Sequence, residues 1–155
     1  MRKESVVDLA KHKLRFSVLQ DEAGICRLPP AAAIPEWAYL GEFFSITKTA
    51  EELSIVCLSR VVPESVEKDS GWKVLKIEGL LNFNLVGILA QVSAVLAESE
   101  VSIFAISTYN TDYILVKNRD FDVAVVVLRK DGHEVVQEYS RCVEDEPKKI
   151  RCKTN

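Results

Sequence analysis

Hydrophobic and polar residues alternate near the start of the chain. Leu14, Phe16 and Val18 are apolar and the residues between them are polar, which predicts a half-buried strand over residues 13–20. Other short apolar runs are bounded by turn-forming residues and also predict strands. These further strands are expected over residues 25–28, 43–47, 54–62, 72–79, 101–108, 112–117 and 133–139.

Two segments in the second half predict helices. From Asn84 to about Ser99 the apolar residues recur at the spacing of one helix face, and Asn84 is a suitable N-cap. Asp120 is expected to cap a second helix that ends before Gly132, although its valines also favour a strand by propensity. Only short helical turns are expected in the first half, around residues 36–40 and 50–53.

The order of elements from Trp72 onward is strand, helix, strand, strand, helix, strand. Two such crossovers pack both helices on one face of a four-stranded antiparallel sheet, which is the ferredoxin-like arrangement. A shift of 60 residues also places FFSITKTAEELSIVC (43–57) on IFAISTYNTDYILVK (103–117), so Phe44 falls on Phe104. This match suggests that a unit of about 60 residues is duplicated.

The predicted fold class is therefore α+β. Two tandem ferredoxin-like units are expected, each with an antiparallel sheet covered by helices on one face. The predicted organisation is an N-terminal extension (1–12), a first unit (13–70), a second unit (71–140) and a charged C-terminal tail (141–155).

Composition narrows the class of protein. The 155 residues are 48% hydrophobic and 28% charged, with a formal net charge of −3, which argues against a general nucleic-acid binder. The N-terminal residues lack the apolar run of a signal peptide, and no stretch approaches the length of a membrane span. Cys26 and Cys57 lie in apolar runs and are interpreted as reduced core thiols. A cytoplasmic protein is expected.

No catalytic or metal-binding set is visible. His12 and His133 are isolated, with no acidic partner suggested by spacing, and are interpreted as surface residues. No nucleophile motif, phosphate-binding loop or dinucleotide-binding motif is present. We therefore expect no enzyme activity, no metal and no cofactor.

The stretch EGLLNFNLVGIL (78–89) is a first candidate site. It leads from a predicted strand into a predicted helix, where free backbone N–H groups suit a carboxylate or a phosphate. Asn82 and Asn84 add amide groups, and Gly87 would allow close approach of the backbone. Helix capping and tight packing of Gly87 explain the same residues without a ligand, and on the residues alone this is the preferred interpretation.

A second candidate is the polar turn of SIFAISTYNTDYILVK (102–117). Six polar residues from Ser107 to Asp112 join two apolar strands, which is more than a plain hairpin needs. Ser107 and Thr108 would suit a carboxylate or an amine, and Asp112 a cation. A turn stabilised by its own side chains is an equally good interpretation of these residues.

Several separated blocks resemble a known family. FAISTYNTDYILVK, PEWAYLGEFFSITKTAEELSIVC and GILAQVSAVLAESEVSIFAIS are similar, in order, to small two-domain ACT proteins and to the arginine-sensing ACT proteins of animals. The resemblance covers about residues 13–132. It implies two tandem ACT units, which typically pair side by side and bind amino acids at the interface between units.

The resemblance also implies a function and a site. The implied function is a non-catalytic regulatory or sensor protein that binds an amino acid and forms a homodimer; the alternative is a ligand-free dimerisation or protein-interaction module. Asn82 stands where the family more often has an aspartate, which argues against arginine specifically. The implied ligand-binding residues are Asn82, Phe83, Asn84, Val86, Gly87, Ile88, Ser107, Thr108 and Asp112.

Overall fold

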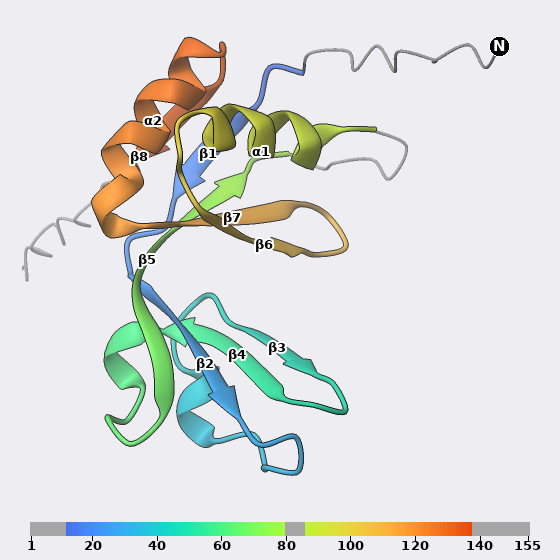
Figure 1. The fold of residues 1–155 in the computed structure, drawn as a ribbon, viewed down its shortest axis with the longest axis vertical. Helices are drawn as coiled ribbons and strands as arrows, with labels where there is room; N and C mark the ends of the chain where they lie inside the picture. Colours follow the sequence, from blue (N-terminus) through green and yellow to red (C-terminus); the bar gives the residue numbers. More distant parts are fainter. Residues whose placement is uncertain (1–11, 80–85, 138–155) are drawn as a thin grey trace, which may run out of the picture.

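The computed structural model describes residues 12–79 and 86–137 (Figure 1). Its α-helices are α1 (Ile88–Glu98) and α2 (Phe121–Lys130), and its 3-10 turns are η1 (Glu36–Tyr39), η2 (Ser59–Val61) and η3 (Asn118–Asp120). Its strands are β1 (Arg15–Val18), β2 (Ala23–Leu28), β3 (Ser45–Lys48), β4 (Leu53–Leu58), β5 (Glu67–Ile77), β6 (Ile103–Ser107), β7 (Asp112–Lys117) and β8 (Glu134–Gln137).

Strand β5 belongs to both halves of the fold. Its first part pairs with β2, which continues the sheet through β4 to β3. Its last part pairs with β1 on one side and with β7 on the other. The sheet of the second half therefore runs β6, β7, β5, β1, β8, and the two halves share one continuous strand.

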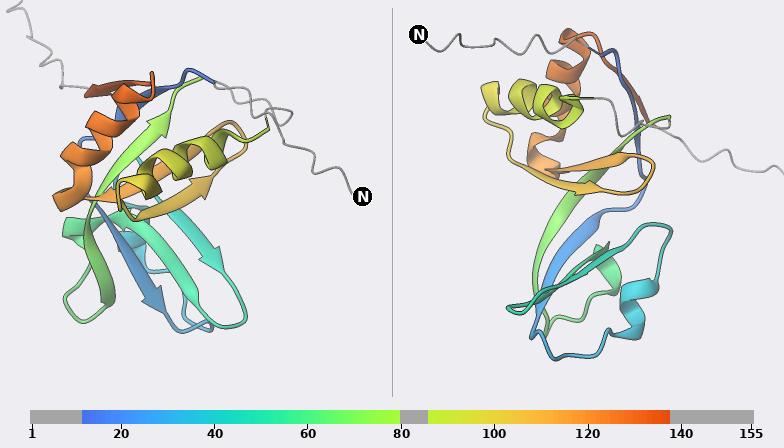
Figure 2. Two further views of the ribbon diagram at one scale, coloured as in Figure 1. Left: turned by 45° about the horizontal axis from the view of Figure 1, so that its top comes forward. Right: turned by 90° about the vertical axis from the view of Figure 1, so that its right-hand side faces the viewer.

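Helices α1 and α2 cover one face of the second sheet (Figures 1 and 2). Both helices bury an apolar stripe against the strands, because their hydrophobic residues recur with the helical period. The resulting core contains side chains from both helices and from four strands, including Phe16, Ile77, Val92, Ile114 and Leu128. The predicted ferredoxin-like α+β class is confirmed for this half.

The first half differs from a helix-covered unit. Among the residues described, its strands are accompanied by the turns η1 and η2 and by no α-helix. Residues around η1 cover one face of β2 and β4 instead, with Ala38 buried against Leu53 and Cys57. The prolines at positions 29, 30 and 35 explain the absence of a longer helix, since proline interrupts helical hydrogen bonding.

Strand β1 was expected in the first unit but lies in the second sheet. It pairs antiparallel with β5 and parallel with β8, so the sheet is mixed and the expectation of a purely antiparallel sheet is wrong. Phe16 and Val18 carry their buried side chains into the helix-covered core. The alternation correctly indicated a strand, but alternation does not specify the partner strand.

The predicted boundaries are correct for the second helix and wrong for the first. α2 begins after Asp120 and ends before Gly132, as predicted. α1 begins at Ile88, and its N-cap is Gly87 with φ of 86°. The helix therefore starts later than predicted, while Asn82, Phe83 and Asn84 lie outside the described residues.

The duplicated segments both form hairpins, β3–β4 and β6–β7. Lys48 pairs with Leu53 across the first turn, and Ser107 pairs with Asp112 across the second. Lys48 thus corresponds in structure to Ser107, and Leu53 to Asp112. The two hairpins are therefore offset by one residue fewer than the shift of 60 that aligns their sequences. A slip of one residue exchanges the two faces of a strand, so aligned identities do not occupy equivalent sites.

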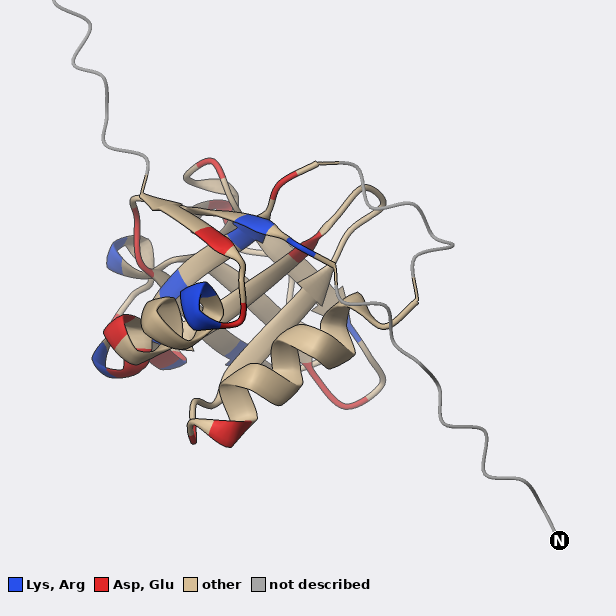
Figure 3. Cartoon of the chain, turned by 90° about the horizontal axis from the view of Figure 1, so that it is seen from above, with Lys and Arg blue, Asp and Glu red and all other residues tan. Residues whose placement is uncertain are grey.

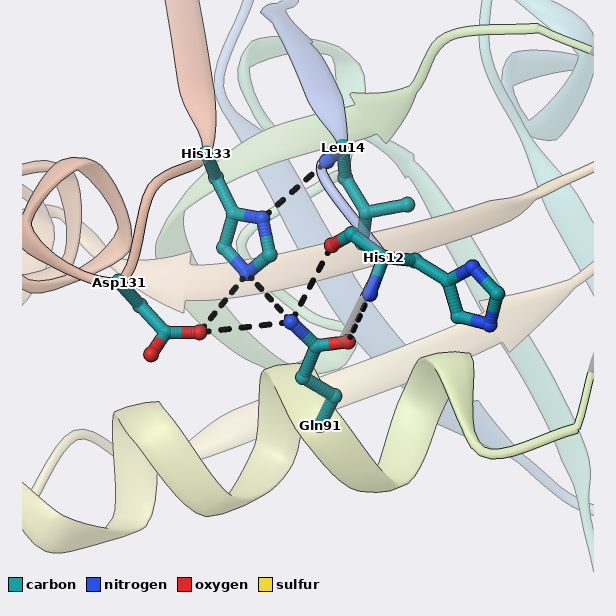
Figure 4. A network of polar contacts seen from close by, with 5 residues as sticks. All are labelled: His12, Leu14, Gln91, Asp131 and His133. Atoms are coloured by element: carbon teal, nitrogen blue, oxygen red, sulfur yellow. Dashed lines mark hydrogen bonds and ion pairs between the residues drawn. The ribbon is translucent and has the colours of Figure 1, made fainter. Parts of the chain in front are cut away.

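His133 is buried, and the expectation that it lies on the surface without an acidic partner is wrong. Its Nδ1 accepts a hydrogen bond of 3.2 Å from the Leu14 backbone, so Nε2 carries the proton of the neutral ring. That nitrogen lies 3.3 Å from Asp131 (Figure 4). The imidazole therefore holds β1 to the turn between α2 and β8.

Gln91 of α1 extends this network (Figure 4). Its amide oxygen accepts from the His12 backbone N–H at 3.1 Å, and its amide nitrogen donates to the His12 carbonyl at 3.2 Å. The same nitrogen lies 3.4 Å from Asp131. One side chain thereby ties the chain entering β1 to the first turns of α1.

Replacing Gln91 with Leu should lower the free energy of unfolding by about 1–2 kcal/mol, because the His12 backbone groups lose their partners. Chemical denaturation measures this. Glu98→Leu, at the exposed end of the same helix, is the matched control and should change stability little. An equal loss in both variants would contradict the assigned role of Gln91.

Candidate functional site

The polar turn between β6 and β7 is closed by its own threonines. The Thr108 backbone N–H and hydroxyl both donate to the Thr111 carbonyl at 2.8 Å, and the Thr111 N–H donates to the Thr108 hydroxyl at 3.3 Å. This is a side-chain-stabilised turn. Thr108 therefore has a structural role that the sequence left open.

Thr111 fastens the turn to the rest of the sheet. Its hydroxyl is buried and donates to the Ile77 carbonyl at 2.6 Å. Ile77 is the last residue of β5, directly before the segment that leads to α1. The hairpin is thus positioned beside the end of β5, although the sequence did not single out Thr111.

Asp112 lies on the helix-covered face of the sheet. Side chains alternate along β7, and Ile114, two residues further, is buried in the core under the helices. Ser107 pairs with Asp112 and shares its face. Figures 1 and 2 show the tip of this hairpin and the start of α1 at the same end of the sheet.

No side chain among the described residues caps the N-terminus of α1. The N-cap residue, Gly87, has no side chain that could do so, and the first turn holds no acidic residue. Figure 3 shows that charge on this helix is confined to its far end, at Glu98. No described side chain therefore competes with an anionic group for the backbone N–H groups of the first turn.

The predicted loop residues in the described region have distinct environments. Val86 is 70% exposed, while the side chain of Ile88 is buried in the core. Ile88 therefore offers only its backbone to a ligand. Gly87 has a positive φ, a conformation that most other residues adopt only with strain.

Glu78 is a charged residue at this end of the sheet that the sequence did not indicate. Its carboxylate accepts a hydrogen bond of 2.5 Å from the Ser17 hydroxyl and lies 3.3 Å from the Lys76 ammonium. The Ser17 hydrogen bond, the strongest cause, and the nearby cations hold the pKa of Glu78 below its ordinary value of 4.5. Because Ser17 comes from β1, only the tertiary structure brings this pair together.

Glu78 and Asp112 lie on opposite faces of the sheet. Ile77 points into the helix-covered core, so the neighbouring Glu78 points to the other face. The structure therefore brings Ser107 and Asp112 together at the end of the sheet where α1 begins, and Glu78 lies on the opposite face.

Hollows lie elsewhere in the described structure, and two of them are lined in part by residues of the first half of the fold. A cavity of about 410 Å³ is lined by the β1–β2 connection, residues 41–43 and parts of β4 and β5, and none of the predicted site residues that the structure describes lines it. A groove of about 240 Å³ separates the two hairpins and is lined by Ser107 together with residues of β3, β4 and β6. Of the predicted site residues that the structure describes, Ser107 alone borders either of these two hollows.

The described residues contain no group of three or more side chains suited to a metal ion. None of the helices they form is long and apolar enough to cross a membrane. Cys26 and Cys57 are buried free thiols, as predicted.

Two protein-family sequence models match this chain. The model described as an ACT domain matches residues 67–130, which contain β5, both helices and the β6–β7 hairpin. A second model, described as an N-terminal domain, matches residues 21–65. The boundary between them falls just before the shared strand β5.

Three relatives illustrate the similarity. The chain is 36% identical to an Agrobacterium tumefaciens protein of known crystal structure, with a TM-score of 0.79, covering 83% of this chain and 96% of that one. The regulatory subunit of aspartate kinase from Thermus thermophilus shares the fold at 9% identity, with a TM-score of 0.54, covering 74% of this chain and 97% of that chain. The human cytosolic arginine sensor for mTORC1 subunit 1 is 29% identical over 101 residues, 58% of this chain. Those residues span 31% of the length of the sensor.

Ser17→Ala should raise the pKa of Glu78 toward 4.5, because the largest cause of its depression is removed. A depressed carboxyl pKa stabilises the fold above the unfolded pKa, and this contribution is lost as pH falls through the folded pKa. The variant should therefore lose less stability than the parent on acidification below about pH 4.5. NMR titration of the Glu78 side chain and denaturation at several pH values measure both effects; an unchanged Glu78 pKa would refute the assignment.

Proposed function

We propose, from the premise that this chain belongs to the ACT-domain proteins, that it is a non-catalytic regulatory protein that binds an amino acid. The observation that carries the proposal is the N-terminus of α1, which no described side chain caps and which lies on the same face and at the same end of the sheet as Asp112. The helix N-terminus suits a carboxylate, and Asp112 suits an ammonium group. Together they offer complementary groups to a zwitterion.

The proposed binding mode uses the predicted residues unequally. Backbone N–H groups at the start of α1, around Gly87 and Ile88, hold the ligand carboxylate. Asp112 holds its amino group, and Ser107 adds a hydroxyl from the paired strand. Thr108 is assigned a supporting role, since its side chain is used within the turn. Asn82, Phe83, Asn84 and Val86 complete the proposed loop.

Regulation follows if the ligand distinguishes two arrangements of the protein. A ligand shifts an equilibrium only by the difference between its affinities for the two states. The segment after Glu78 leads directly into α1, and α1 is tied to β1 through Gln91. Holding the helix start would therefore favour one placement of β1 and α1. The proposal includes a cytoplasmic homodimer formed through the ACT domains.

The second candidate is a ligand-free interaction module. The bonds within the 108–111 turn favour this alternative, because they explain much of the polar sequence without a ligand. In that case Asp112→Asn would weaken the dimer, and neither the parent nor the variant would respond to an amino acid. Light scattering of the parent and the variant distinguishes the two functions.

Asp112→Asn should weaken amino acid binding by about 10- to 100-fold, since a charge-assisted hydrogen bond is worth about 1.5–3 kcal/mol. Isothermal titration of the parent against all twenty amino acids identifies the ligand first. Asp122→Asn on the exposed side of α2 is the matched control and should bind normally. An absence of heat with every amino acid at millimolar concentration would exclude the amino acid proposal.

The ligand should lose most of its affinity when its carboxylate is converted to an amide, because a neutral group gains little from the helix N-terminus. The cognate amino acid at 100 times its dissociation constant should raise the stability of the fold by about 2.7 kcal/mol. Thermal denaturation with the acid and with its amide measures the difference. Equal stabilisation by both would place the carboxylate away from α1.

A further inference from the structure

Three large apolar side chains are exposed together on the first half of the fold. Tyr39, Leu40 and Phe44 are 50%, 51% and 42% exposed. The rings of Tyr39 and Phe44 meet edge to face, with centroids 5.6 Å apart. We call these three residues the apolar patch. Clusters of this kind on a protein surface commonly mark binding sites.

The apolar patch stands beside an open sheet edge. Strand β3 pairs with β4 on one side, and no hydrogen bond from the other described residues reaches its outer backbone groups. Phe44 directly precedes β3, so the patch lies at the start of this edge. An extended chain can add to such an edge through backbone hydrogen bonds, while apolar contacts select its side chains.

The other two sheet edges in the described structure, β8 and β6, differ from β3 in what lies beside them. At β8, the Arg129 guanidinium donates to the Val135 carbonyl at 2.7 Å and occupies part of the edge. At β6, the outer edge is unpaired among the described residues, as it is at β3, and both strands border one groove. β3 is distinguished from β6 by the apolar patch, which directly precedes it.

The segment that carries the apolar patch and β3 is acidic, and this charge indicates which kind of partner fits the surface. Residues 36–52 contain Glu36, Glu42, Glu51 and Glu52 but only one cation, Lys48. Among the ion pairs between described residues, none involves these four carboxylates. A symmetric contact with a second copy would bring this acidic surface against itself, which is unfavourable. A basic partner is complementary.

We propose that the β3 edge and the apolar patch bind an extended basic segment of a partner protein, which adds to the sheet as a strand. Its alternate apolar side chains contact Tyr39, Leu40 and Phe44, and its lysines or arginines face the surrounding carboxylates. This surface lies in the first half of the fold and does not depend on amino acid binding near α1.

The test uses a fluorescent peptide of four Val-Lys repeats and, as its matched control, four Val-Glu repeats. Fluorescence anisotropy with the full chain should show binding of the Val-Lys peptide and at least about tenfold weaker binding of the Val-Glu peptide. Methylating alternate backbone nitrogens of the Val-Lys peptide should abolish binding, because strand addition needs those N–H groups. Salt should weaken binding, since the attraction is partly ionic.

Phe44→Ser should reduce affinity for the Val-Lys peptide by at least about tenfold, as loss of an aromatic contact commonly does. Val123→Ser on α2, 47% exposed, is the matched control and should bind normally. If Phe44→Ser fails to fold, Tyr39→Ser provides the same test. Equal affinity in the patch variants and the control, or equal binding of both peptides, would overturn the proposal. Self-association of the parent that Phe44→Ser abolishes would also overturn it, by assigning the patch to a second copy.

Discussion

Backbone pairing along β5 is the interaction on which the rest of the structure depends. Its first residues bond to β2, and its last residues bond to β1 and β7. Trp72 stands where these pairings meet, opposite Ala23 in one ladder and Lys117 in the other. One continuous strand therefore joins the two halves at this residue, where the register with β2 shifts between Ala23 and Ile25.

The side chains packed at this junction keep the two proposed sites on different parts of the fold. Trp72, Val56 and Leu115 belong to an apolar cluster that fills the space between the first half and the helix-free face of the second sheet. The first half therefore covers the face opposite α1 and α2. The proposed amino acid site remains at the end of the helix-covered face, and the proposed partner surface lies at the far edge of the first half, at β3.

Local sequence patterns predicted many of the helices and strands but few of the pairings between strands. The β6–β7 hairpin and α2 were correctly placed because their signals lie within a few residues of each other. The sequence predicted β5 only from residue 72, since Lys68, Asp69 and Ser70 resemble a loop by composition, whereas the strand begins at Glu67. These residues form a strand because β2 satisfies their backbone, and pairing of that kind leaves no pattern in the side chains.

The features of the candidate site also fall into two groups, those that the sequence indicated and those that only the tertiary structure decided. The sequence by itself indicated Asp112, the polar turn and a helix beginning near Asn84, because turn chemistry and helical periodicity depend on neighbouring residues. Tertiary structure alone decided that Thr111 fastens the turn to Ile77 and that β1 joins the second sheet. It also brought His133 to Leu14, 119 residues away. Such contacts form when buried polar groups must find partners, and the nearest available partner is set by the packed fold rather than by position along the chain.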